Sequence, residues 1–188
     1  DGKPVLWEAC ITMTSFWWGY DKREKTYKTP EFLIRMLVDI VSKGGNLLLN
    51  IGPKPDGTIQ KEFVDRLAAI GRWMNKYSES IYGTTASPLA KLDWGRCTKK
   101  VNPTGATLYL HVFNWPADGK LVVPGLKNQI QKAWLLADKK RTPLAVSAVA
   151  ASRQSADLFD LAALASLPGV QVIEVAADRV PANDLGRA

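Results

Sequence analysis

Histidine and cysteine are scarce in this sequence. His111 is the only histidine among 188 residues, and Cys10 and Cys97 are the only cysteines. The two thiols lie far apart and lack metal-ligand spacing, so a zinc site, a Cys-His nucleophile pair and a Ser-His-Asp triad are all poorly supported. His111 falls in an apolar segment, which predicts a place on a strand or in the core. We therefore expect no metal and no cofactor.

Long apolar runs are also missing. The longest, such as residues 46–51, fall far short of the roughly 20 residues that span a bilayer. No membrane span is predicted, and no signal peptide is visible. The pattern instead predicts a chain that begins inside a domain.

Charge of one sign is not clustered either. The formal net charge is +7, but basic and acidic residues alternate, as in residues 21–25. Such a stretch is typical of a solvated loop, and no nucleic-acid-binding motif accompanies it. We expect no nucleic-acid partner. A nucleic-acid-binding domain remains as an alternative only because of the charge.

The residues that are present indicate a folded domain. Hydrophobic residues make up 46% of the chain and charged residues 23%, which is close to the average for globular proteins. There are also seven tryptophans. Most of them are explained by core filling. One or two could instead cover the apolar face of a sugar ring, so carbohydrate binding stays open.

The first half of the chain alternates between strand and helix patterns. Residues 3–10 predict a strand with Glu8 near its C-terminal end. Thr29 is a good N-cap, and Pro30 suits the first helical position. An apolar i, i+3/i+4 stripe follows until Gly44, where we expect the helix to end.

A second strand and helix complete this pattern. Residues 46–51 form a continuous apolar run, which is typical of a strand covered on both faces. Residues 60–77 then carry a second helical stripe. This alternation with short joins predicts parallel β/α units. Two units are too few to close a sheet, so further strands must complete it.

The pattern changes near residues 84–88. Beyond this point short strand-like runs recur between turn signals, which predicts an all-β sandwich. Residues 107–115 alternate with period 2, and the turn at 117–119 predicts a hairpin that returns through 121–123. Residues 157–165 are ambiguous, with a helical local propensity. Further strands are expected at 133–137, 144–149 and 170–175.

Several motifs stand in a specific order along the chain. They are WEACIT at 7–12, SFWWGY at 15–20, SKGGNLLLNIGP at 42–53, DGTI at 56–59, RL at 66–67, IGRW at 70–73 and IYGT at 81–84. In this order and spacing they resemble the α-L-fucosidases of glycoside hydrolase family 29. The resemblance is dense from about 7 to 84 and weaker at 94–98 and 108–115.

The resemblance implies an architecture and an activity. Residues 1–86 would form the C-terminal part of a (β/α) TIM-like barrel, and 87–188 an all-β sandwich. The activity would be that of an exo-acting, retaining hydrolase that releases terminal α-L-fucose from glycans or glycosides. Its partners would be the fucosylated substrate and the upstream remainder of the barrel, while a homo-oligomer stays open. The compartment is undetermined; by resemblance it would be periplasmic, secreted or lysosomal.

A retaining hydrolase needs two carboxyl groups about 5–5.5 Å apart. The family's general acid/base is a glutamate late in the barrel, and Glu8 in the Trp-Glu motif matches it. Barrel enzymes keep their chemistry at the C-terminal ends of strands, where we expect Glu8. A solvated strand-end carboxylate or an ion-pair partner is the alternative for this residue.

The nucleophile does not transfer to this chain. In the family it is an aspartate on an earlier strand, in a Trp-x-Asp-Gly setting. Asp1 precedes Gly2 but stands only seven residues before Glu8, which is too close. Asp21, Asp39 and Asp56 have no matching context. The chain is therefore expected to carry one catalytic carboxylate and to lack the upstream nucleophile.

Sugar contact is assigned to the loop that follows Glu8. Trp18 and Tyr27 are the candidates for packing on the fucose methyl group; the alternative is that they only plug the top of the barrel. Asn46 and Asn50 bracket the second strand and are interpreted as supports of the barrel top. The alternative function is a non-catalytic carbohydrate-binding or assembly module derived from a fucosidase.

Overall fold

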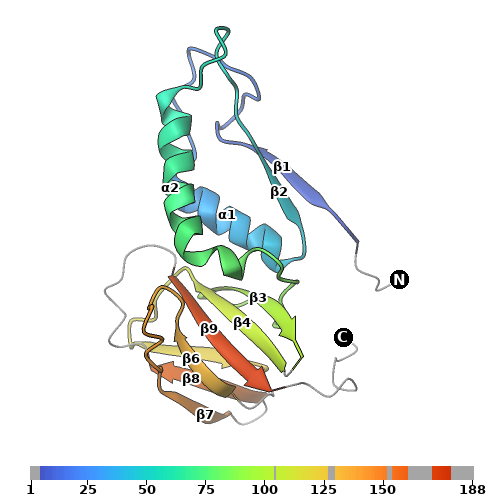
Figure 1. Cartoon of the computed structure of the whole chain (residues 1–188), viewed down its shortest axis with the longest axis vertical. Coiled ribbons are helices and arrows are strands. Elements are labelled where there is room, and N and C mark those ends of the chain that lie inside the picture. The colour runs from blue at the N-terminus through green and yellow to red at the C-terminus, as the bar shows by residue number, and fades with distance from the viewer. Residues whose placement is uncertain (1–4, 104, 127–129, 152–153, 161–170, 179–188) are drawn as a thin grey trace.

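The computed structural model describes residues 5–103, 105–126, 130–151, 154–160 and 171–178, and it consists of two successive kinds of structure (Figure 1). Strands and helices alternate up to about residue 80, and antiparallel strands follow from residue 95. Among the described residues neither α-helix is both long and apolar enough to cross a membrane.

The first part holds two parallel strands and two helices. Its elements are β1 (Glu8–Thr12), α1 (Pro30–Ser42), β2 (Asn46–Asn50), α2 (Lys61–Tyr77) and the short 3₁₀ turn η1 (Ser78–Ser80). β1 and β2 pair in parallel, with Glu8 opposite Asn46 and Thr12 opposite Asn50. Both helices lie on the same side of this pair (Figure 1).

Helix α1 follows its local sequence signals. The Thr29 hydroxyl accepts a hydrogen bond from the Phe32 amide at 3.1 Å, and Pro30 occupies the first helical position. Gly44 adopts a φ of 79°, which ends the helix without the penalty a side chain would bring. Leu33 and Val38 are buried residues of this helix. The predicted boundaries of α1 are confirmed.

The predicted end of the first strand is wrong. We expected Glu8 near the C-terminal end of a strand over residues 3–10, but β1 begins at Glu8 and ends at Thr12. Its parallel partner β2 ends at Asn50. Backbone pairing with β2 defines the strand, whereas the prediction from sequence rests on the positions of the apolar residues. The apolar run and the paired segment are offset by several residues.

Strand β2 differs from expectation on one face. Leu49 and Ile51 pack against the cluster of Met13, Leu33 and Phe63 beneath the helices. The opposite face carries Leu48, which is 50% exposed among the described residues. Within the part of the chain that the structure describes, the parallel pair is therefore covered on one side only.

The second part is built from two antiparallel sheets. One has the strand order β3-β4-β9-β6, and the other has the order β5-β8-β7. A shared core of buried residues from β4, β5 and β9 lies between them, including Leu110, Leu121 and Ile173. The strands are β3 (Gly95–Asn102), β4 (Gly105–Val112), β5 (Lys120–Pro124), β6 (Ile130–Leu135), β7 (Val146–Ala151), β8 (Gln154–Asp160) and β9 (Gln171–Asp178).

Strand β4 is buried on both faces. Leu108, Leu110 and Val112 face the core between the sheets. Tyr109 lies in a second cluster with Val38 of α1 and Trp73 of α2. The predicted period-2 alternation is confirmed. One face meets the other sheet, and the opposite face meets the helices of the first part.

One prediction about the later strands is wrong, and the ambiguous stretch is a strand in its described part. The turn before residue 120 forms, with Gly119 at a φ of 69°, but residues 121–123 do not return along β4. They belong to β5, which pairs with β8 in the other sheet. Residues 157–160, for which the local propensity is helical, belong to strand β8, where ladder pairing on both sides overrides propensity. Residues 161–165 lie outside the described ranges.

An ion-pair cluster joins α1 to the sandwich. The Arg96 guanidinium on β3 donates from Nε to Asp39 Oδ1 at 2.6 Å, and Lys43 pairs with the other carboxylate oxygen. Arg35 donates to the Phe113 carbonyl at 2.8 Å. Partial burial raises the pKa of Asp39, but the hydrogen bonds from Lys43 and Arg96 outweigh it and hold that pKa below its usual value.

Candidate active-site edge

The C-terminal ends of β1 and β2 meet at one edge of the parallel pair, pointing away from the sandwich (Figure 1). Thr12 lies opposite Asn50 in the register. The Met13 amide continues the ladder by donating to the Asn50 carbonyl at 3.3 Å. The chain then leaves the sheet in a loop and returns at Tyr27, which forms a β-bridge with Thr14. This edge is where parallel β/α sheets place their ligand sites.

Large aromatic side chains gather on this loop and remain exposed. We call residues 16–20 the aromatic loop. An exposed cluster of large aromatic groups is uncommon unless a ligand or another chain segment covers it. The exposed fractions are 77% for Phe16, 53% for Trp17, 53% for Trp18 and 39% for Tyr20.

The aromatic loop is held by its backbone, which leaves its side chains available. Thr12 Oγ1 donates to the Trp17 carbonyl at 3.0 Å. Thr14 Oγ1 donates to the same carbonyl and accepts from the Trp17 amide at 3.1 Å. Asn50 Nδ2 donates to the Trp18 carbonyl at 2.7 Å. The ends of both strands thus fix the loop.

The two predicted sugar-contact residues have different surroundings. Trp18 is exposed on the aromatic loop. Tyr27 instead packs edge-on against Phe63 at 5.8 Å between ring centroids, beneath the Arg66 guanidinium. Its hydroxyl donates to the Glu24 carbonyl and accepts from Gln60. These contacts fit the alternative interpretation, in which Tyr27 plugs the loop against the helices.

Glu8 is not brought together with Trp18. It is exposed at the start of β1 and lies opposite Asn46 at the start of β2. Thr12 lies four residue steps further along the strand, which is about 13 Å at the usual rise of a strand. Asn46 therefore lies at the opposite end from Asn50, and only Asn50 supports the candidate edge.

Three other carboxylates are engaged in local structure. Hydrogen bonds from the Arg23 side chain and amide lower the pKa of Asp21 to about 2. The Thr58 hydroxyl and amide hold the pKa of Asp56 below its usual value. Asp39 serves the ion-pair cluster described above. Asp1 lies outside the described residues.

The scarce metal-ligand residues do not cluster. Cys97 is buried and its burial raises the pKa of its thiol to about 12, while Cys10 is exposed. His111 is fully buried on β4, as predicted for a core residue. Across the described ranges no group of three or more histidine, cysteine or acidic side chains could hold a metal ion.

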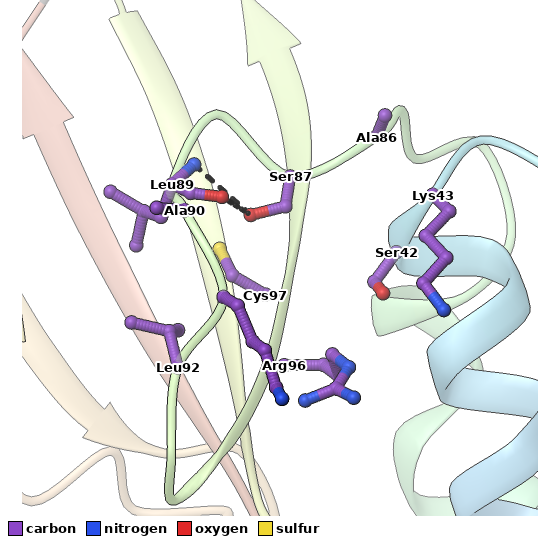
Figure 2. Close-up of a pocket in the computed structure, with 10 residues that line it drawn as sticks. Ser42, Lys43, Ala86, Ser87, Leu89, Ala90, Leu92, Arg96 and Cys97 are labelled. Carbon is purple, nitrogen blue, oxygen red and sulfur yellow. Dashed lines mark hydrogen bonds between the residues drawn. The ribbon is translucent and has the colours of Figure 1, made fainter.

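A cavity of about 630 Å³ lies elsewhere, at the junction of α1 and the sandwich (Figure 2). In Figure 2 Ser42 and Lys43 lie on the helix, across the cavity from Ser87 and Arg96. Two polar side chains of this cavity are already engaged, since Ser87 exchanges hydrogen bonds with Leu89 and Arg96 binds Asp39. We therefore place the candidate site at the strand ends rather than here.

Sequence reasoning missed part of the site. Thr12 and Thr14 were not recognised as anchors, although two threonines within four residues of an aromatic run were a usable signal. Phe16 and Trp17 were not singled out beside Trp18. Their exposure depends on how the loop packs, which no local pattern reveals.

The sequence is similar to α-L-fucosidases. The family profile described as Alpha-L-fucosidase matches residues 1–79. An α-L-fucosidase of Dictyostelium discoideum is 37% identical over 144 residues, which cover 75% of this chain and 31% of the relative. The tissue α-L-fucosidase of Homo sapiens is 39% identical over 119 residues, covering 61% of this chain and 25% of the relative.

Solved structures extend the likeness to most of the chain. α-L-Fucosidase isoenzyme 1 of Paenibacillus thiaminolyticus superposes with a TM-score of 0.83 at 37% identity, covering 95% of this chain and 41% of that one. An α-fucosidase of Thermotoga maritima in complex with fucose gives a TM-score of 0.77 at 29% identity, with coverages of 93% and 41%. The chain thus spans about two-fifths of the solved relatives and at most about a third of the curated ones.

Proposed function

The chain corresponds to the C-terminal portion of larger α-L-fucosidases of glycoside hydrolase family 29, and on that basis we propose that it forms part of an exo-acting, retaining α-L-fucosidase. In this proposal residues 1–86 complete a (β/α) barrel, and residues 87–188 form the sandwich that follows it. The substrate is a terminal α-L-fucose on a glycan or glycoside.

One observation carries the proposal beyond the family likeness. The exposed aromatic loop lies at the C-terminal ends of two parallel strands, which is where a barrel presents its substrate. Aromatic faces suit the apolar side of a sugar ring, and Trp18 is the residue we assign to the fucose methyl group. The open face of the pair, with Cys10 and Leu48 exposed, is the face that further barrel strands would cover.

The chemistry requires two carboxyl groups on opposite sides of the glycosidic bond. One attacks the anomeric carbon as an ionised nucleophile, and the other protonates the departing oxygen. Asp21, Asp39 and Asp56 are held in local hydrogen bonds. We therefore assign the nucleophile to a part of the enzyme outside this chain.

The full-length protein, with any sequence encoded on either side of this chain, is expected to hydrolyse nitrophenyl α-L-fucoside. Proton NMR of the first-formed sugar should show the α anomer, because a double displacement retains configuration. Nitrophenyl β-D-galactoside is the control and should not turn over. No hydrolysis of the fucoside, together with binding of fucosylated glycans, would favour the non-catalytic module instead.

The general acid/base role of Glu8 remains a prediction from the resemblance, and the strand geometry does not favour it. Because Glu8 begins β1, we expect Glu8→Gln to lower turnover of activated and natural-type fucosides alike, by less than about tenfold. A general acid would behave differently. Its loss would slow poor leaving groups by about 10²–10⁴-fold and spare nitrophenyl substrates.

Kinetics of Glu8→Gln on the two substrate types, with and without azide, decide between these roles. Azide can attack a fucosyl-enzyme without base assistance, so it restores turnover only when the acid/base is missing. Selective loss with azide rescue would establish Glu8 as the acid/base. Equal small losses without rescue would move that role to another carboxylate.

A further inference from the structure

The position of the aromatic loop depends on residues at the end of β2. Phe16, Trp17 and Trp18 are more than half exposed, so their side chains cannot hold the loop in place by packing. The loop backbone is instead bound from beneath. Asn50 Nδ2 donates to the Trp18 carbonyl at 2.7 Å and lies 3.4 Å from Thr12 Oγ1. Asn50 therefore links the end of β2 to both the loop and β1.

Two residues further on, Gly52 meets the same loop by direct backbone contact. A Cβ added at Gly52 would lie 2.5 Å from the Gly19 carbonyl carbon and 2.6 Å from the Tyr20 nitrogen. Real Cβ atoms essentially never come so close, and backbone on both sides cannot yield as a flexible side chain would. The loop backbone can approach residue 52 this closely only because residue 52 lacks a side chain.

Gly71 provides the contrast. It lies on α2 rather than on the loop, and a Cβ added there would meet nothing within 4 Å. Neither glycine has a positive φ. A change at Gly52 therefore acts through the loop position, and a change at Gly71 adds the same methyl group without displacing anything.

We propose that Asn50 and Gly52 are positioning residues. They set how close the aromatic loop lies to the end of β2, and thereby how strongly the enzyme prefers a 6-deoxy sugar over the same ring without its methyl group. This inference rests on the proposed function. The aromatic faces must meet a single methyl group on the pyranose ring. A displacement of about 1 Å weakens this contact, because dispersion and apolar burial fall steeply with separation. Asn50 and Gly52 touch no substrate themselves.

The test compares Gly52→Ala with Gly71→Ala in the full-length protein. Hydrogen exchange of peptides covering the aromatic loop reports, without substrate, how firmly the loop backbone is held. Gly52→Ala should speed exchange there, whereas Gly71→Ala should match the parent protein. Asn50→Asp, which places a carboxylate oxygen against the Trp18 carbonyl, should act like Gly52→Ala.

Kinetics then measure discrimination between nitrophenyl α-L-fucoside and nitrophenyl β-D-arabinopyranoside, the same ring without its methyl group. One methyl in an apolar site is worth on the order of tenfold or more in kcat/KM. Gly52→Ala and Asn50→Asp should lose most of this preference through a raised KM for the fucoside. Both Gly71→Ala and the parent protein should keep it.

The outcomes separate cleanly. Equal exchange and equal discrimination for Gly52→Ala and Gly71→Ala overturn the inference. Faster loop exchange with unchanged discrimination overturns it as well, because the loop then moves without affecting the sugar. Failure of the proposed function is seen earlier, as a parent protein that hydrolyses neither glycoside.

Discussion

The 188-residue chain on its own is expected to release no nitrophenol from nitrophenyl α-L-fucoside. Its parallel pair has only two strands, and one face of that pair is open among the described residues. A retaining mechanism needs two carboxyl groups about 5–5.5 Å apart. Glu8 lies at the start of β1, the end of the strand away from the aromatic loop. Asp21, Asp39 and Asp56 are held in local hydrogen bonds. Activity should therefore be below detection.

A spectrophotometric assay of the purified chain measures this, with far-UV circular dichroism to show that helix and strand content are present. The full-length protein serves as the positive control. Turnover by the chain alone at a rate near that of the full-length protein would contradict the prediction. It would also show that the nucleophile lies within these residues.

Acid is expected to destabilise the protein through His111. The ring is fully buried, and its Nε2 lies 3.1 Å from Thr98 Oγ1. That hydroxyl donates to the Ser80 carbonyl at 2.7 Å, so Nε2 carries the proton and donates to Thr98. Nδ1 has no hydrogen-bond partner. Protonation of Nδ1 would thus bury a charge without an acceptor.

The direction of the pH effect follows from the pKa values. Burial lowers the pKa of His111 from 6.5 to about 3 in the folded protein. Above pH 6.5 the residue is neutral in both states, and its contribution to stability is complete. Below pH 6.5 only the unfolded chain takes up the proton, so stability falls as pH falls toward 3. At pH 5 the loss is about 2 kcal/mol, from about 1.4 kcal/mol per pH unit.

Urea denaturation of the full-length protein at pH 7.5, 6.5 and 5 checks this against His111→Gln. Glutamine can still donate to Thr98 but does not titrate, so the variant isolates the protonation effect. The difference in unfolding free energy between the two proteins should change by about 2 kcal/mol from pH 7.5 to pH 5. Parallel pH profiles would show that His111 does not set the acid sensitivity.

Local signals were sufficient for helix α1. Thr29 and Pro30 define its start, and Gly44 defines its end, because capping and left-handed backbone are decided within a few residues. The same holds for the alternation of β4. Its period of two places Leu108 and Leu110 on one face and Tyr109 on the other, whatever packs there later.

Local signals did not predict which strands pair with each other. The turn before β5 was predicted, but its partner β8 was not, since either sheet can satisfy the same backbone groups. Hydrogen bonding to β2 likewise decided that β1 begins rather than ends at Glu8. An apolar run shows that a strand is present but not which of its residues find a partner.

The sequence by itself determined the family likeness, the order of β/α and antiparallel elements, and the burial of His111, because each depends on residue types in fixed local order. Only the tertiary structure showed which residues hold the candidate site together. Asn50 and Gly52 are separated from the aromatic loop by about 30 residues, and their contacts exist because parallel pairing brings the ends of β1 and β2 together. Close approach of two distant backbones leaves no periodic trace in a sequence.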